Sequence, residues 1–130
     1  MENKLPSIID FAEGEVVEIQ DDNRGNLVVH EIAKVIPFQV KRVFFVYLNK
    51  SGLIRGNHGH RECWQVLVAL DGQIEVTGVN QHSQNTWNLS NPKNLLLVPP
   101  MNIIRYKSLS GSSILGVYCS EHFNQDDYIY

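Results

Sequence analysis

The sequence predicts an all-β protein, and three observations support that class. Short runs of β-branched and aromatic residues recur along the 130 residues, and turn-forming Gly, Pro, Asn and Asp separate them. Helix signals are limited to two short turns near the termini, at 7–11 and 121–130. About eight to ten such runs in a chain of this length favour one sandwich or barrel domain spanning residues 1–130.

Each expected strand follows from a local pattern. The run at 40–48 is the richest in β-branched and aromatic residues, and its alternation places 42, 44 and 46 on one face and 43, 45 and 47 on the other. The runs at 65–70 and 73–79 flank Asp71-Gly72, a strong hairpin signal. Residues 21–26 form a turn by composition. Further strands are expected at 14–20, 27–32, 86–89, 94–98, 103–109 and 113–119.

Composition excludes several classes of protein. The net charge is −3, which argues against a nucleic-acid partner. No apolar run reaches the roughly 18 residues of a transmembrane helix, so no membrane partner is expected. The N-terminus lacks the apolar segment of a signal peptide, and we expect a cytoplasmic protein. Cys63 and Cys119 lie in apolar segments and are interpreted as reduced core residues.

The most informative segment is Arg-Gly-Asn-His-Gly-His at 55–60. Histidines at 58 and 60, two positions apart on a strand, point to the same face. With Gly52, Gln65 and Gly72 they give the spacing G-x5-H-x-H-x4-Q-x6-G, which resembles the first cupin motif with glutamine in place of its usual glutamate. The resemblance implies a double-stranded β-helix, the cupin jelly roll.

The same motif bears on metal binding. Cupin metal sites normally have four protein ligands: the two histidines of the first motif, its glutamate, and a third histidine from a second motif. Here Gln65 replaces the glutamate, and Ile104 or Arg105 stands where the third histidine is expected. We therefore expect no metal and no cofactor, and we interpret His58 and His60 as acid/base groups. A weak metal site, or two ordinary polar side chains, remains as an alternative.

Basic residues suggest an anion site near the histidines. Arg55 precedes the pair, Arg42 lies on the run at 40–48, Arg105 follows the second motif, and Arg24 lies in the early turn. Guanidinium forks suit phosphate and carboxylate oxygens, so these four residues are candidates to hold a diphosphate.

Beyond the cupin motif, six segments at 22–27, 36–45, 55–60, 65–72, 97–101 and 126–129 resemble the WxcM-like cupins, the dTDP-sugar 3,4-ketoisomerases. The resemblance implies a homodimer, often with exchanged N-terminal strands. It also implies isomerisation of dTDP-4-keto-6-deoxyglucose to a 3-keto sugar, upstream of an aminotransferase that makes 3-amino-3,6-dideoxy sugars. Relatives usually carry tyrosines where this chain has Phe44 and Phe45.

The resemblance maps the family's histidine pair onto His58 and His60 and its arginine onto Arg55. Removing the proton at C3 and returning one to C4 needs a base, and we assign this role to His60. His58 is then expected to exchange protons with the sugar oxygens. Sequence alone does not fix which histidine has which role. Arg55 and Tyr47 are candidate donors to the enediolate.

Two further residues complete the expected site. Asn57 is a candidate contact to the sugar, and Gln65 is expected either to bond a sugar hydroxyl or to orient a histidine. Three alternatives stay open: a cupin that binds a nucleotide sugar without turnover, a 3,5-epimerase-like enzyme, and a metal-dependent cupin enzyme.

Overall fold

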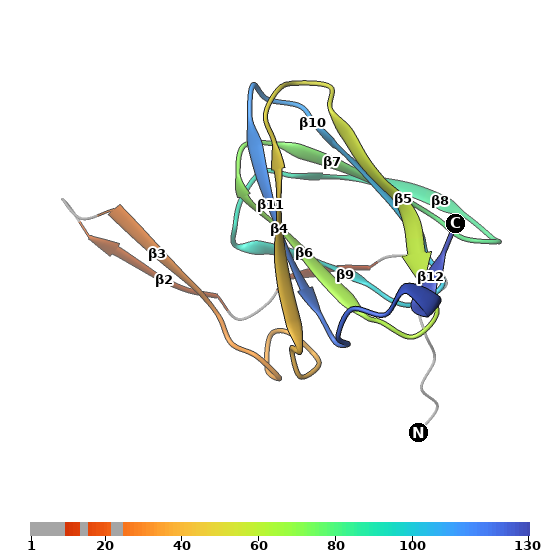
Figure 1. Ribbon diagram of the computed structural model, residues 1–130. Coiled ribbons are helices and arrows are strands. Elements are labelled where there is room, and N and C mark those ends of the chain that lie inside the picture. The colour runs from red at the N-terminus through yellow and green to blue at the C-terminus, as the bar shows by residue number, and fades with distance from the viewer. Residues whose placement is uncertain (1–9, 14–15, 22–24) are drawn as a thin grey trace.

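The computed structural model describes residues 10–13, 16–21 and 25–130 and consists almost entirely of antiparallel strands (Figure 1). The strands are β1 (Asp10–Glu13), β2 (Val16–Asp21), β3 (Gly25–His30), β4 (Arg42–Leu48), β5 (Ile54–His60), β6 (Gln65–Asp71), β7 (Ile74–Val79), β8 (Gln84–Leu89), β9 (Asn94–Val98), β10 (Ile103–Ser108), β11 (Ser113–Cys119) and β12 (Tyr128–Ile129), with one 3₁₀ helix, η1, at Gln125–Asp127.

Two five-stranded sheets form the body of the molecule. One has the order β1-β9-β6-β11-β4 and the other β12-β5-β10-β7-β8. Neighbours in each sheet are mostly far apart in sequence, which is the connectivity of a jelly roll. The all-β jelly roll predicted from the sequence is confirmed.

The main core lies between the two sheets because alternate side chains of each strand point inward. On β4, Val46 and Leu48 are buried while Val43, Phe45 and Tyr47 are exposed, so the predicted alternation holds. The buried residues of this core include Leu67, Ile74, Val76, Leu89, Leu96, Ile104, Leu115 and Val117. Fully burying each such side chain stabilises the fold by about 1.5–3 kcal/mol.

A second, smaller core lies on the outer face of the first sheet. There the segment before β4 packs over β6 and β9, through Val35, Ile36, Phe38 and Val40 against Val66, Val68 and Leu95. β6 is therefore buried on both faces, which accounts for its unbroken apolar sequence, Val-Leu-Val-Ala-Leu.

The two terminal helical turns predicted from the sequence have different outcomes. Asp10 and Phe11 begin β1, which pairs with β9, so long-range backbone pairing overrides a weak local helix preference there, while residues 7–9 lie outside the described part of the chain. At the other end a short 3₁₀ turn is present within 121–130, as predicted, and leads into β12, which pairs with β5.

Strands β2 and β3 pair only with each other in the described residues and form a separate two-stranded sheet. Figure 1 shows this hairpin extending away from the two packed sheets. Leu27 on β3 and Ile32, two residues after its end, have 50% and 52% of their surface exposed, so this part of the molecule leaves apolar surface uncovered.

Candidate active site

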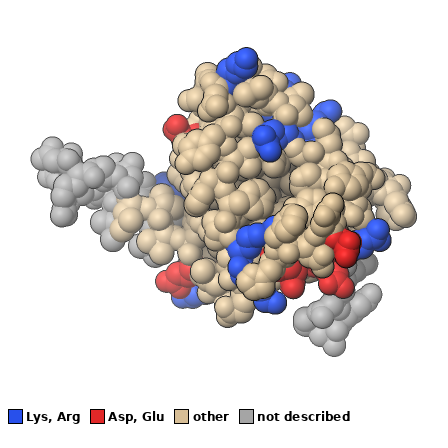
Figure 2. Space-filling view, viewed as in Figure 1, with Lys and Arg blue, Asp and Glu red and all other residues tan. Residues whose placement is uncertain are grey.

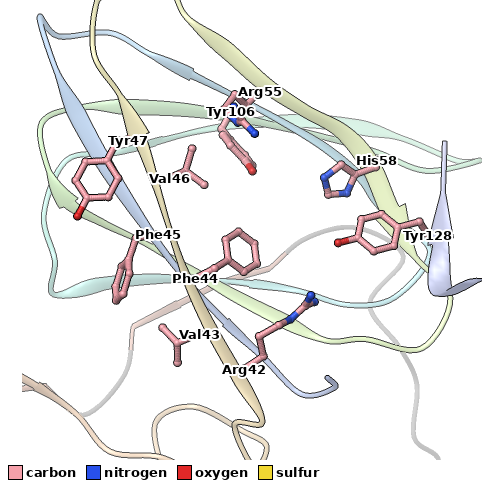
Figure 3. Close-up of a pocket in the computed structure, with 10 residues that line it drawn as sticks. All are labelled: Arg42, Val43, Phe44, Phe45, Val46, Tyr47, Arg55, His58, Tyr106 and Tyr128. Carbon is pink, nitrogen blue, oxygen red and sulfur yellow. The ribbon is translucent and has the colours of Figure 1, made fainter. Parts of the chain in front are cut away.

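A cavity of about 510 Å³ opens between β4 of one sheet and the β5–β12 edge of the other. Its walls carry two arginines, one histidine and several tyrosines together with apolar side chains (Figure 3). The lining residues are Arg42, Val43, Phe44, Phe45, Val46, Tyr47, Arg55, His58, Tyr106 and Tyr128. This size falls in the range typical of small-molecule sites.

β5 places both histidines on one face, as the two-residue spacing predicts. Their ring centroids lie 5.7 Å apart with an interplanar angle of 89°. The strand is irregular just before them, because Gly56 and Asn57 have φ of 101° and 66° and the pairing with β10 shifts there. This bulge directs His58 into the cavity, in the way that bulges re-aim side chains beside binding sites.

His60 lies behind His58 rather than in the cavity, with only 5% of its surface exposed. Its Nδ1 lies 2.9 Å from Oδ2 of Asp127, and its Nε2 lies 3.3 Å from Nε2 of Gln65. A carboxylate only accepts, so Nδ1 carries the proton, and in the neutral ring Nε2 accepts from the Gln65 amide. Both ring nitrogens are therefore occupied by protein groups.

His58 differs from His60 because it lines the cavity. Burial lowers the pKa of His58 below its usual 6.5, and the neighbouring His60 lowers it further. Its Nδ1 is buried and has no hydrogen-bond partner among the described residues. The ring is thus neutral near pH 7 and faces the cavity, which are the properties of a general base.

Arg42 forms the lower wall of the cavity as seen in Figure 3, beside Tyr128. Burial lowers the pKa of Arg42, but Cys119 and a hydrogen bond with Tyr128 outweigh it, so the pKa is raised and the side chain stays charged. Its guanidinium carbon lies 5.6 Å from the Phe44 ring and 5.8 Å from the Phe123 ring. Its Nε is buried and has no hydrogen-bond partner in the described part of the chain.

Arg55 and Tyr106 form the opposite wall. Tyr106 is buried, and burial raises the pKa of this phenol, partly offset by the nearby charge of Arg55. Tyr106 therefore stays protonated and can donate a hydrogen bond to an oxyanion.

The structure brings Arg42, Arg55 and His58 together at this cavity, with His60 and Gln65 directly behind. It does not bring Asn57 or Arg105 there: both line a different, smaller cavity with Thr77 and Gln84. On β10 the side chain of Arg105 points outward and that of its neighbour Tyr106 points inward, because successive residues alternate.

Tyr47 lies at the rim of the cavity with 64% of its surface exposed on the outer face of β4, so it is poorly placed as an oxyanion donor. Gln65 contacts His60, which agrees with the second of its two expected roles, the orientation of a histidine. Arg24 lies outside the described residues.

Sequence reasoning missed Tyr106, Asp127 and Tyr128. The alternation along the run at 103–109, counted from the apolar Ile104, places Tyr106 inward and could have identified it. Asp127 and Tyr128 carry no such signal, since their position depends on β12 pairing with a strand nearly 70 residues earlier, Tyr128 opposite His60.

The donor set does not suit the metal site of the cupin motif. Gln65 offers an amide that is bonded to His60, and Ile104, at the expected third-histidine position, is a buried core residue. Ligand atoms of His60, Cys63 and Asp127 do lie within 4.8 Å of one another, but His60 and Asp127 already share a direct hydrogen bond.

Cys63 and Cys119 are both free and buried, as predicted. Both belong to the main core between the sheets, and the Cys63 thiol donates to the Trp64 carbonyl at 3.4 Å. The Cys119 sulfur also accepts from the Gln65 amide at 3.6 Å, so the pair packs behind the histidines.

A jelly roll with an H-x-H pair beside a cavity walled by arginines and phenols has the architecture of a cupin. Comparison with known families agrees: residues 8–130 match the model of the FdtA family, described as WxcM-like, C-terminal. The chain belongs to this family.

Individual relatives are similar over most of the chain. TDP-4-oxo-6-deoxy-alpha-D-glucose-3,4-oxoisomerase of Aneurinibacillus thermoaerophilus is 33% identical over 108 residues, which cover 83% of this chain and 78% of the relative. A 3,4-ketoisomerase from Helicobacter canadensis is 29% identical with a TM-score of 0.82, covering 93% of this chain and 89% of that one.

A third relative was solved with a nucleotide. QdtA, a sugar 3,4-ketoisomerase from Thermoanaerobacterium thermosaccharolyticum in complex with TDP, is 25% identical with a TM-score of 0.83, covering 97% of this chain and 89% of that one.

Proposed function

We propose that this protein is a sugar-nucleotide 3,4-ketoisomerase that converts dTDP-4-keto-6-deoxyglucose to the 3-keto isomer. The observation that carries the proposal is His58, a neutral imidazole that faces a cavity between two arginines in a chain of the FdtA family. The named activity of the Aneurinibacillus and Helicobacter relatives supports the substrate class.

The reaction needs little beyond proton transfer. The carbonyl at C4 acidifies the C–H bond at C3, a base removes that proton, and an enediol forms. Returning a proton to C4 leaves the ketone at C3. A single base on one face of the ring serves both carbons, and a neutral histidine is suited to this near pH 7.

We assign the carbon base to His58 and not to His60, the reverse of the order predicted from the sequence. His60 is buried, and protein groups occupy both of its nitrogens, so it has no free lone pair for the sugar. Its role is to support His58 from behind and to lower the pKa of that ring.

The cations of the cavity divide between the two ends of the substrate. Arg42 lines the cavity and stays charged, and a guanidinium suits a diphosphate oxygen. Arg55 and the protonated Tyr106 lie together on the opposite wall, where they stabilise the negative charge that develops on the enediolate.

The product of this step is a 3-keto sugar, the substrate class of an aminotransferase. The protein therefore acts in the biosynthesis of 3-amino-3,6-dideoxy sugars, upstream of the amination. No metal takes part in the proposed mechanism, because proton transfer alone accounts for the reaction.

We further propose that the protein is a homodimer with exchanged N-terminal strands. β4 is an edge strand whose outer face exposes Val43, Phe45 and Tyr47, and Figure 2 shows little charge over this part of the molecule. The β2–β3 hairpin also exposes apolar side chains. Unpaired strand edges and apolar patches of this kind are usually covered in a soluble protein.

The test is to incubate the purified protein with dTDP-4-keto-6-deoxyglucose and follow the sugar signals by NMR. We expect the 3-keto isomer to form and His58→Asn to abolish its formation. His82→Asn is the matched control, because His82 is exposed in the β7–β8 turn, and it should convert substrate at the wild-type rate. Tight binding of dTDP with no product would instead support a nucleotide-sugar-binding cupin.

A further inference from the structure

The last residues of the chain are fixed against the histidine pair by several independent contacts. β12 pairs with β5 so that Tyr128 lies opposite His60 and Ile129 opposite Gly59. The Asp127 carbonyl accepts from the Arg61 amide at 2.8 Å. Its carboxylate accepts from His60, from the Glu62 amide at 2.7 Å and from the Cys63 amide at 3.4 Å.

These contacts place one phenol next to the proposed base. The Tyr128 ring centroid lies 5.0 Å from that of His58 and 4.5 Å from that of His60. Figure 3 shows its hydroxyl directed into the cavity, on the same side as Arg42. Tyr128 therefore lies beside the proposed base and faces the cavity.

The proposed isomerisation includes one proton transfer for which no residue has been assigned so far. Besides moving a proton from C3 to C4, it must move the hydroxyl proton of O3 to O4. His60 is occupied on both nitrogens, and Tyr47 faces outward. Tyr106 lies on the wall with Arg55, whereas Tyr128 contacts the His58 ring.

We propose that Tyr128 is a catalytic residue that carries the proton between the two sugar oxygens, and that Asp127 is the positioning residue that holds it there. This inference rests on the proposed isomerase function and goes beyond it by assigning the second proton-transfer group.

The steps balance. His58 first takes the C3 proton, which gives an enediolate whose charge on O4 is stabilised by Arg55 and Tyr106. The Tyr128 hydroxyl then gives its proton to O4, and the phenolate takes the proton from O3, so the negative charge moves to O3. Protonated His58 finally returns its proton to C4 as the C3 carbonyl forms. Both side chains end in their starting states, so no external reductant or oxidant is needed.

The decisive variant is Tyr128→Phe, assayed with dTDP-4-keto-6-deoxyglucose in deuterium oxide. Two rates are followed by NMR: exchange of the C3 proton with solvent, which needs His58, and formation of the 3-keto sugar, which needs both groups. We expect kcat for conversion to fall by about 100-fold, the typical contribution of one acid/base group, with a much smaller change in KM. Exchange should fall far less, so the ratio of exchange to conversion rises by about tenfold or more.

Two companion variants separate a catalytic role from a structural one. Tyr130→Phe removes a phenol two residues away that is 86% exposed, and it should leave both rates at the wild-type level. Asp127→Asn keeps the shape of the side chain but weakens its hold on His60, and it should lower kcat more than it raises KM. Thermal melting of each variant checks that the fold is retained.

Wild-type conversion by Tyr128→Phe would overturn the inference while leaving the isomerase function intact. An equal fall of exchange and conversion in a folded Tyr128→Phe variant would also overturn it, because that result is expected of a purely structural residue. If the wild-type protein neither exchanges nor converts the sugar, the proposed function itself fails.

Discussion

At the scale of single residues, His58 and His60 show how neighbouring side chains of one type receive different roles. They share a strand face, and their rings lie 5.7 Å apart. His60 is held by Asp127 and Gln65, whereas His58 lines the cavity and its buried Nδ1 has no hydrogen bond to any described residue. The residues behind the pair therefore set which ring is free to take a proton from a substrate.

The lowered pKa of His58 makes a prediction about pH. Because only the neutral ring is a base, kcat/KM should stay high as pH falls through 6.5 and decline only below it. In His60→Asn the charge effect of His60 is lost but burial remains, so the pKa of His58 should rise toward 6.5 without reaching it. Histidine proton NMR between about pH 5 and 8, with His58→Asn for assignment, measures both values. A wild-type pKa at or above 6.5, or no rise in the variant, would contradict this assignment of the base.

Residue-level prediction from sequence succeeds where strand alternation decides the answer. The two-residue spacing puts both histidines on one face, and alternation along 40–48 puts Arg42 inward. On β10 the same rule favours the inward Tyr106, whereas Arg105, which was chosen for its charge, points outward and lines a different cavity. Asp127 and Tyr128 were out of reach, because the site receives them through tertiary pairing that no local pattern encodes.

At the scale of elements, strand β5 needs glycine at two positions, Gly56 and Gly59. A Cβ atom added at Gly59, which lies between the histidines, would stand 2.4 Å from the backbone oxygen of Asn102. Gly56, with φ of 101°, adopts a left-handed conformation that other residues rarely take. The geometry of the site therefore depends on glycine at these places.

Gly59→Ala should accordingly weaken both fold and function. Backbone must move to admit the methyl group, at a cost of about 1–3 kcal/mol in the free energy of unfolding, and both histidines would shift with it. Gly111→Ala is the matched control, since nothing lies within 4 Å of the position that its methyl group would take. Thermal melting and the isomerase assay measure the two effects; a Gly59→Ala protein as stable and active as wild type would refute this interpretation of the strand.

Element boundaries were predictable to within one or two residues for strands that have their own apolar run, such as β9 and β11. The short β1 and β12 were not, because four and two residues respectively are too few to show a period. Both exist because a longer strand supplies their hydrogen-bond partners.

At the scale of the whole molecule, two separate surfaces remain uncovered. The edge strand β4 exposes an apolar outer face, and the β2–β3 hairpin extends away from the two packed sheets (Figure 1). Exchange of the hairpin between two copies would cover both. Within the described residues, no helix is long and apolar enough to cross a membrane.

The proposed dimer predicts a change in mass on mutation. Wild-type protein should have twice the mass of the 14.8 kDa chain by light scattering, and Phe45→Glu, which puts a charge on the outer face of β4, should shift it toward the monomer. Val79→Glu, at an exposed position on the other sheet, should leave the dimer intact. A monomeric wild-type protein, or a Phe45→Glu protein that stays dimeric, would count against the exchange.

The whole mechanism depends on His58 moving a proton between adjacent carbons of a nucleotide-linked keto sugar without help from a metal ion. The position of deuterium decides this, determined by NMR after chelator-treated enzyme has reacted with dTDP-4-keto-6-deoxyglucose in deuterium oxide. We expect a 3-keto product formed at the untreated rate, with deuterium entering only at C3 of the substrate and C4 of the product. Deuterium at C5, or activity that disappears with the chelator and returns with a divalent cation, would show that the mechanism is wrong.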